Sequence, residues 1–180
     1  MITLKAFERG DFDQLIEWVN TKELLTDWAG SLFSFPLTAE SLEWYITDTN
    51  APVNSDAFVY KVIDESNGKT IGHISLGAIS RKNRSGRISR VLLGDAAYKG
   101  KGICKQMIRQ ILSIGFDELQ LHRIGLGVYD DNHSAIRCYK SAGFVVEGVS
   151  RDVLWFNGRF RNLIEMSMLE DEWRGVVGSR

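Results

Sequence analysis

A short glycine-containing segment near the middle of the chain has the composition of a phosphate-binding turn. Lys99-Gly100-Lys101-Gly102-Ile103-Cys104 lies between a predicted strand and the predicted start of a helix. Glycines let the backbone turn tightly and bring its N–H groups close to a ligand. The first amides of a helix have no partner within the helix, and with the helix dipole they favour an anion. The segment therefore predicts a phosphate or pyrophosphate site; the alternative is a glycine-rich turn without a ligand.

Two common nucleotide-binding motifs do not fit this segment. The Walker pattern GxxxxGK[ST] fails because no Ser or Thr follows Gly-Lys. The dinucleotide pattern GxGxxG fails because Lys105 occupies the position of the third glycine. The segment is therefore neither a P-loop nor a dinucleotide-binding turn.

Periodic apolar patterns predict the elements that must position this segment. We expect strands at 2–7, 57–64, 69–79, 87–93, 123–129, 144–156 and 159–169, and helices at 12–19, 37–48, from 102 and at 134–142. Asn67-Gly68 and Asn157-Gly158 predict tight hairpin turns, and Gly143 is expected to end the last helix. The sequence shows no repeat or linker, so we predict one mixed α/β domain over residues 1–180.

The composition is that of a globular protein with a sizeable core. The chain has 180 residues, of which 44% are hydrophobic and 25% charged, with two prolines. No apolar stretch approaches the roughly 18 residues of a membrane-spanning helix, and the N-terminus becomes charged too early for a secretory signal. We therefore expect a soluble, cytoplasmic protein. The two cysteines, Cys104 and Cys138, are too few for a disulfide framework and lack metal-ligand spacing, so we expect both to have packing roles.

Charge is distributed unevenly along the chain. Residues 1–60 hold ten acidic and three basic residues, a balance of −7, whereas residues 81–110 hold nine basic residues and one acidic, a balance of +8. The basic block surrounds the glycine segment and suits an anionic ligand, and the acidic block suggests a cationic one. The simpler interpretation is that both blocks form solvated surfaces.

The glycine segment closely resembles the Gln/Arg-x-x-Gly-x-Gly/Ala loop of the GCN5-related N-acetyltransferase (GNAT) superfamily, which holds the pyrophosphate of acetyl-CoA. From RVLLGDAAYKGKGI through ELQLHRIGLGVYDDNHSAIRCYKSAGF the chain is similar to ribosomal-protein and polyamine N-acetyltransferases, and the resemblance extends from Ile2 to Trp173. Two loop positions differ: Lys99 replaces the usual Gln or Arg, and Cys104 replaces the last Gly or Ala. The resemblance implies the GNAT fold, a central, mostly antiparallel twisted sheet with splayed strands and flanking helices.

The resemblance also implies roles for individual residues. Backbone amides at Leu92, Leu93 and Gly94 would bind pantetheine and the thioester carbonyl. The pyrophosphate would be held by the loop residues Lys99, Gly100, Lys101, Gly102, Ile103 and Cys104. Tyr139 would be the general acid that protonates the departing thiolate, although its position on an apolar helix face also fits a core tyrosine. Asn132 fits equally a helix N-cap and a ligand contact.

The general base is left open by the sequence. The strand before the loop carries no carboxylate. Deprotonation of the amine could pass through waters, through Glu23 or Asp27, or through His73, and proximity of the reactants could supply much of the rate. The resemblance implies no metal or redox cofactor.

We expect an enzyme that moves an acetyl group from acetyl-CoA to a primary amine by direct attack in a ternary complex. The acidic first third favours a cationic acceptor: a polyamine, an aminoglycoside-like amine or a protein N-terminus. One alternative is a non-catalytic acyl-CoA-binding module on the same fold, and another is nucleic-acid binding through residues 81–110. We expect neither nucleic acid nor membrane as a partner, and homodimer formation is an open prediction.

Overall fold

The strands form one seven-stranded sheet in the order β1-β2-β3-β4-β5-β7-β6. The computed structural model describes residues 1–178. The strands are β1 (Ile2–Ala6), β2 (Phe58–Asp64), β3 (Lys69–Ser80), β4 (Ser85–Leu93), β5 (Arg123–Tyr129), β6 (Val145–Phe156) and β7 (Arg159–Leu169). Neighbouring strands are antiparallel except β4 and β5, which are parallel. The expected mixed α/β class and mostly antiparallel sheet are confirmed.

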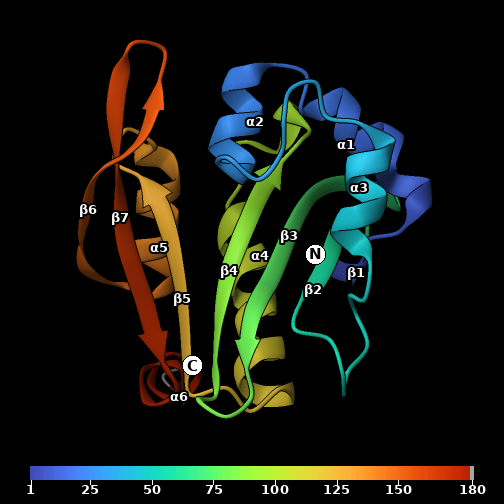
Figure 1. The fold of residues 1–180 in the computed structure, drawn as a ribbon. Helices are drawn as coiled ribbons and strands as arrows, with labels where there is room; N and C mark the ends of the chain where they lie inside the picture. Colours follow the sequence, from blue (N-terminus) through green and yellow to red (C-terminus); the bar gives the residue numbers. More distant parts are fainter. Residues whose placement is uncertain (179–180) are drawn as a thin grey trace.

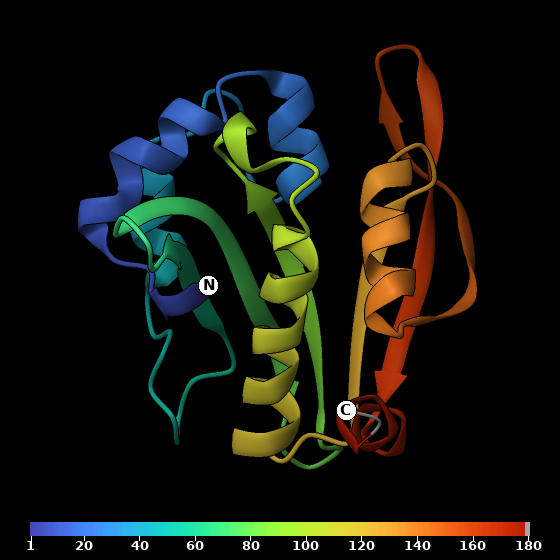
Figure 2. The ribbon, with the colours of Figure 1, turned by 180° about the vertical axis from the view of Figure 1, so that it is seen from behind.

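Helices cover both faces of the sheet. The helices α1 (Phe12–Trp18), α2 (Lys22–Ala29) and α3 (Ala39–Ile46) lie on one face (Figure 1), and α4 (Ile103–Ser113) and α5 (His133–Ala142) lie on the other (Figure 2). A last helix, α6 (Glu170–Gly178), follows β7. The apolar stripe of α4 is fully buried in the core through Met107, Ile108, Ile111 and Leu112. Within residues 1–178, no helix is long and apolar enough to cross a lipid bilayer.

The sheet opens between its two parallel strands. β4 and β5 pair only where Ser85–Arg87 meets Arg123–Gly125, and beyond these residues the strands diverge (Figure 1). Arg90 lies where the register of β4 against β3 shifts, and its φ of 53° places it in the left-handed region. Such a bulge bends its strand. Along the second half of β4, the edge of the strand that faces β5 is therefore unpaired.

Most elements lie where the sequence predicts them, but two helices were not predicted. Gly68, Asn157 and Gly158 all have positive φ values of 49° to 77°, as tight hairpin turns require. The omitted helices are α2 and α6, both short. Helix α2 has only eight residues, and its single N-cap, Thr21, is a weak sequence signal. This omission matters because α2 borders the site.

Candidate active site

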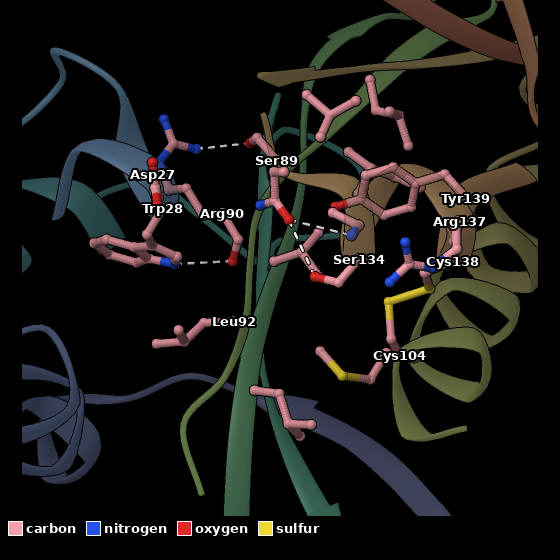
Figure 3. Close-up of a pocket in the computed structure, with 18 of the residues that line it drawn as sticks. Asp27, Trp28, Ser89, Arg90, Leu92, Cys104, Ser134, Arg137, Cys138 and Tyr139 are labelled. Carbon is pink, nitrogen blue, oxygen red and sulfur yellow. Dashed lines mark hydrogen bonds between the residues drawn. A yellow bond between two sulfur atoms is a disulfide. The ribbon is translucent and has the colours of Figure 1, made fainter. Parts of the chain in front are cut away.

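A cavity of about 940 Å³ occupies the opening between β4 and β5. Its walls are the second half of β4, the end of β5, the glycine segment at the start of α4, one face of α5, and part of α2 (Figure 3). A cleft of this size, formed where two strands part, can hold an extended ligand with one end on the helix start. Most of the residues singled out from the sequence line it.

The glycine segment has the geometry of an anion-binding turn. Gly100 and Gly102 have φ values of 76° and 74°, a left-handed conformation that side chains disfavour. A Cβ at either position would meet no protein atom within 4 Å, so the backbone conformation, rather than packing, requires glycine there. Helix α4 begins at Ile103 without a side-chain cap, which leaves its first amides available. The segment therefore suits the diphosphate that the sequence predicts.

Basic side chains surround this helix start. Lys99, Lys105 and Arg137 line the cavity and could neutralise phosphate groups. Lys101 differs, because its ammonium lies 5.7 Å from the centre of the Tyr98 ring and its side chain is not part of the cavity wall. Arg137 was not predicted from the sequence, since its position in the cavity depends on how α5 packs beside α4.

The strand end before the loop presents its amides in alternating directions. The Gly94 amide donates to the Ile71 carbonyl of β3 at 3.0 Å, so it is already used within the sheet. Alternation along the antiparallel pair directs the Leu92 amide to β3 as well and the Leu93 amide to the open edge. Of the three predicted amides, Leu93 is therefore the one left for a ligand. Packing requires glycine at position 94, because a Cβ there would overlap the Trp18 ring.

Tyr139 combines a buried ring with a position in the cavity wall. The residue is 6% exposed, and burial raises the pKa of its phenol to about 12. Its side chain lines the cavity and its hydroxyl points into the open space (Figure 3). The phenol therefore keeps its proton at neutral pH beside the strands that would hold the thioester. A protonated phenol in the cavity wall can donate a hydrogen bond or a proton to a bound ligand, and its role as general acid stays a prediction.

Asn132 serves as the N-cap of α5. Its side-chain oxygen accepts hydrogen bonds from the Ala135 amide and the Ser134 hydroxyl, both at 3.2 Å. The residue also lines the cavity. The capping role is therefore present in the structure, and the ligand contact stays a prediction.

Cys104 and Cys138 form a disulfide, which corrects the expectation that both have only packing roles. Cys104 is in the first turn of α4 and Cys138 is on α5, with 6.4 Å between their Cα atoms (Figure 3). Both residues line the cavity. The bridge joins the helix that carries the glycine segment to the helix that carries Tyr139. Two cysteines 34 positions apart in sequence give no indication of this pairing, because it depends on the packing of α4 against α5.

Of the three residues named as candidates for the general base, only Asp27 lines the cavity. Glu23 is highly exposed and accepts a hydrogen bond from Asn157, which lowers the pKa of its carboxyl and makes it a weaker base. His73 is 1% exposed, and burial lowers the pKa of its imidazole to about 4. Its Nδ1 lies 2.9 Å from the Arg90 carbonyl. His73 therefore holds the bulge of β4 rather than facing a substrate.

The α2 side of the cavity contains two residues that sequence reasoning missed, Trp28 and Arg90. The Trp28 indole N–H donates to the Arg90 carbonyl at 2.9 Å, so α2 and His73 hold the same carbonyl of the bulge (Figure 3). Of the ten acidic residues in the first third of the chain, Asp27 alone lines the cavity. The acidic excess of this region is therefore mostly outside the site.

Comparison with known proteins agrees with this fold. The family model described as an acetyltransferase (GNAT) domain matches residues 1–145. A spermidine N(1)-acetyltransferase of Vibrio cholerae is 27% identical over 172 residues, which cover 96% of this chain and 95% of that protein. An aminoglycoside N(6')-acetyltransferase type 1 of Klebsiella pneumoniae is 25% identical over 152 residues, 82% of this chain and 75% of that protein.

Solved structures agree as well. The crystal structure of spermidine N-acetyltransferase from Vibrio cholerae in complex with CoA and spermine superposes with a TM-score of 0.82 at 26% identity, covering 96% of this chain and 97% of that one. The open sheet, the glycine segment and these similarities define an acyl-transferring fold. The chain belongs to the GNAT acetyltransferase family. It is an acetyl-CoA-dependent N-acetyltransferase.

Proposed function

We propose that the protein transfers the acetyl group of acetyl-CoA to a cationic primary amine by direct attack within a ternary complex. The observation that carries this proposal is the shared cavity, which has the anion-binding turn at one end and the Tyr139 phenol in its wall. The similar Vibrio cholerae enzyme, whose structure holds CoA and spermine, supports a polyamine-like acceptor. An aminoglycoside-like amine or a protein N-terminus fits the same chemistry.

Each part of the cavity has a separate task in this reaction. The amides around Gly102 and the side chains of Lys99 and Lys105 would bind the diphosphate of the cosubstrate. The Leu93 amide, at the open edge of β4, would donate to the thioester oxygen as negative charge develops there. Tyr139 would give its proton to the departing sulfur.

The acceptor would enter from the α2 side. Asp27 lines that side and would hold an ammonium group of the acceptor. The reacting ammonium group first loses a proton to solvent water. The neutral amine then attacks, the carbon–nitrogen bond forms and the carbon–sulfur bond breaks, and the sulfur takes the proton from Tyr139. The second proton lost by the nitrogen restores the Tyr139 phenol, which leaves the N-acetyl product and the free thiol of CoA. Direct attack is supported because Cys104 and Cys138 are bonded to each other, so neither sulfur is a free thiolate that could carry the acetyl group.

Release of free CoA from acetyl-CoA in the presence of candidate amines tests this proposal. The panel contains spermidine, an aminoglycoside and a short peptide with a free N-terminus. We expect CoA release that depends on at least one amine, with one N-acetyl product formed per CoA. Tight acetyl-CoA binding without release for any amine would instead indicate the non-catalytic acyl-CoA-binding module.

A further inference from the structure

One guanidinium on the acceptor side of the cavity lacks the carboxylate partner that its neighbours have. Arg90 lines the cavity at the bulge of β4. Within residues 1–178, no carboxylate lies within ion-pair distance of Arg90. Nearby, Arg87 pairs with Glu165 at 2.8 Å, and Arg161 pairs with Asp27 at 2.7 Å. The positive charge of Arg90 is therefore available to a ligand in the cavity.

The guanidinium of Arg90 is held in place without being neutralised. Its Nη1 donates to the Ser89 hydroxyl at 2.9 Å and to the Ser75 hydroxyl at 3.4 Å. Its central carbon lies 4.9 Å from the centre of the Tyr45 ring. Nε is buried without a hydrogen-bond partner, and the positive charge acts on the buried Tyr45 phenol, where it opposes the rise in pKa that burial causes. A fixed cation that lines the cavity without a carboxylate partner is suited to an incoming anionic oxygen.

The carboxylate of Asp27, opposite in charge to Arg90, lies on the same side of the cavity. Asp27 precedes Trp28, whose indole N–H is bonded to the Arg90 carbonyl, so α2 holds Asp27 close to the bulge (Figure 3). The Asp27 side chain is 41% exposed, and only one of its two oxygens is used, by Arg161. Asp27 and Arg90 do not pair with each other within ion-pair distance. The acceptor side therefore presents one negative and one positive group that a single ligand could bridge.

We propose that the acceptor is a primary amine that also carries a carboxylate, of the diamino-acid type. This inference rests on the proposed function and narrows its substrate class. The α-carboxylate of the acceptor binds Arg90, its α-ammonium faces Asp27, and its side-chain amine is the nucleophile. A linear polyamine would place an ammonium group against Arg90 instead, and this like-charge contact disfavours its binding.

Matched pairs of acceptors that differ only by the carboxylate test this inference. CoA release is measured with L-lysine against cadaverine and with L-ornithine against putrescine, and spermidine is included. For the wild-type protein we expect kcat/KM at least about tenfold higher for each amino acid than for its diamine. Equal or higher kcat/KM for the diamines or for spermidine would overturn the inference while leaving the proposed function intact. Lack of release with every amine would instead contradict the proposed function and this inference with it.

Substitution of Arg90 separates recognition from a structural effect. Arg90→Gln keeps a hydrogen-bond donor for the two serines but removes the charge, so we expect the amino-acid preference to disappear while acetyl-CoA affinity, measured by calorimetry, stays within about threefold. The matched control is Arg84→Gln, since Arg84 pairs with Glu170 and does not line the cavity; this variant should keep the preference. An equal loss for amino acids and diamines in Arg90→Gln would show that Arg90 only supports the bulge, and the inference would be wrong.

Discussion

Tyr139 is the residue whose surroundings bear most directly on the chemistry. Its ring is packed in the core against Phe144, with 6.3 Å between the ring centres, and its side chain also lines the cavity. The sequence offered a core tyrosine or a general acid as alternatives. The structure shows that the side chain belongs to the core and also lines the cavity, and the acid role stays a prediction. The phenol is protonated at neutral pH, as an ordinary phenol is, and burial raises its pKa further, to about 12.

Tyr139→Phe removes this proton while keeping the ring. We expect kcat to fall by about 10²-fold, at the lower end of what general acid catalysis contributes. The KM for acetyl-CoA should stay within about threefold, because the hydroxyl is needed mainly when the sulfur departs. Steady-state kinetics of CoA release measures both values. An unchanged kcat would remove the acid role from Tyr139.

His73 predicts a measurable effect of pH on stability. Burial lowers the pKa of its imidazole from 6.5 to about 4, so between these pH values the unfolded chain binds more protons than the folded one. Stability is therefore lost as the pH falls from about 6.5 toward 4, by about 3 kcal/mol from this residue at most. His73→Gln lacks this contribution, so urea unfolding at pH 7 and pH 4.5 should show a smaller drop for the variant. Identical drops in the two proteins would contradict the assignment.

At the scale of elements, the site depends on how α4 and α5 are held on either side of the divergent strands. α4 carries the glycine segment at its start, α5 carries Tyr139, and the disulfide between Cys104 and Cys138 joins them. On the opposite face, α2 is attached to β4 through the Trp28 hydrogen bond and to β7 through Arg161 and Asp27. These attachments connect the elements that line the cavity.

The disulfide should contribute to stability. Its cysteines are 34 positions apart, and a loop of that size corresponds to about 3 to 4 kcal/mol in the chain-entropy account. We expect a reducing agent such as dithiothreitol to lower the urea midpoint of the wild-type protein. The double variant Cys104→Ser with Cys138→Ser serves as control and should not respond to the reductant. Titration of two free thiols in the untreated protein would show that the bridge does not form.

The sequence predicted what local patterns determine. The strands at Arg123–Tyr129 and Arg159–Leu169 agree with the predicted bounds, because alternation and the Asn157-Gly158 turn are local signals. The two glycines of the loop were recognised for the same reason. Features that depend on residues far apart in sequence were missed: the disulfide, the use of the Gly94 amide by β3, and the approach of Arg90 to α2.

In the whole molecule, the charged residues that line the cavity could not be identified from how charge is distributed along the sequence. Most of the acidic residues of the first third lie outside the cavity, whereas Arg90, Lys99 and Lys105 of the basic block line it. A net positive lining suits an anionic cosubstrate such as acetyl-CoA. Asp27 is the one carboxylate that lines the cavity within residues 1–178, so we expect an ammonium group of the acceptor to lie beside it.

Calorimetric titration of acetyl-CoA into the protein tests most directly whether the backbone of the glycine segment binds the diphosphate of acetyl-CoA. We expect one molecule to bind per chain. Gly102→Val should weaken binding by at least about tenfold, because a β-branched residue disfavours the φ of 74° that directs these amides, while the melting temperature reports that the variant is folded. No binding to the wild-type protein, or equal affinity for a folded Gly102→Val variant, would contradict the account.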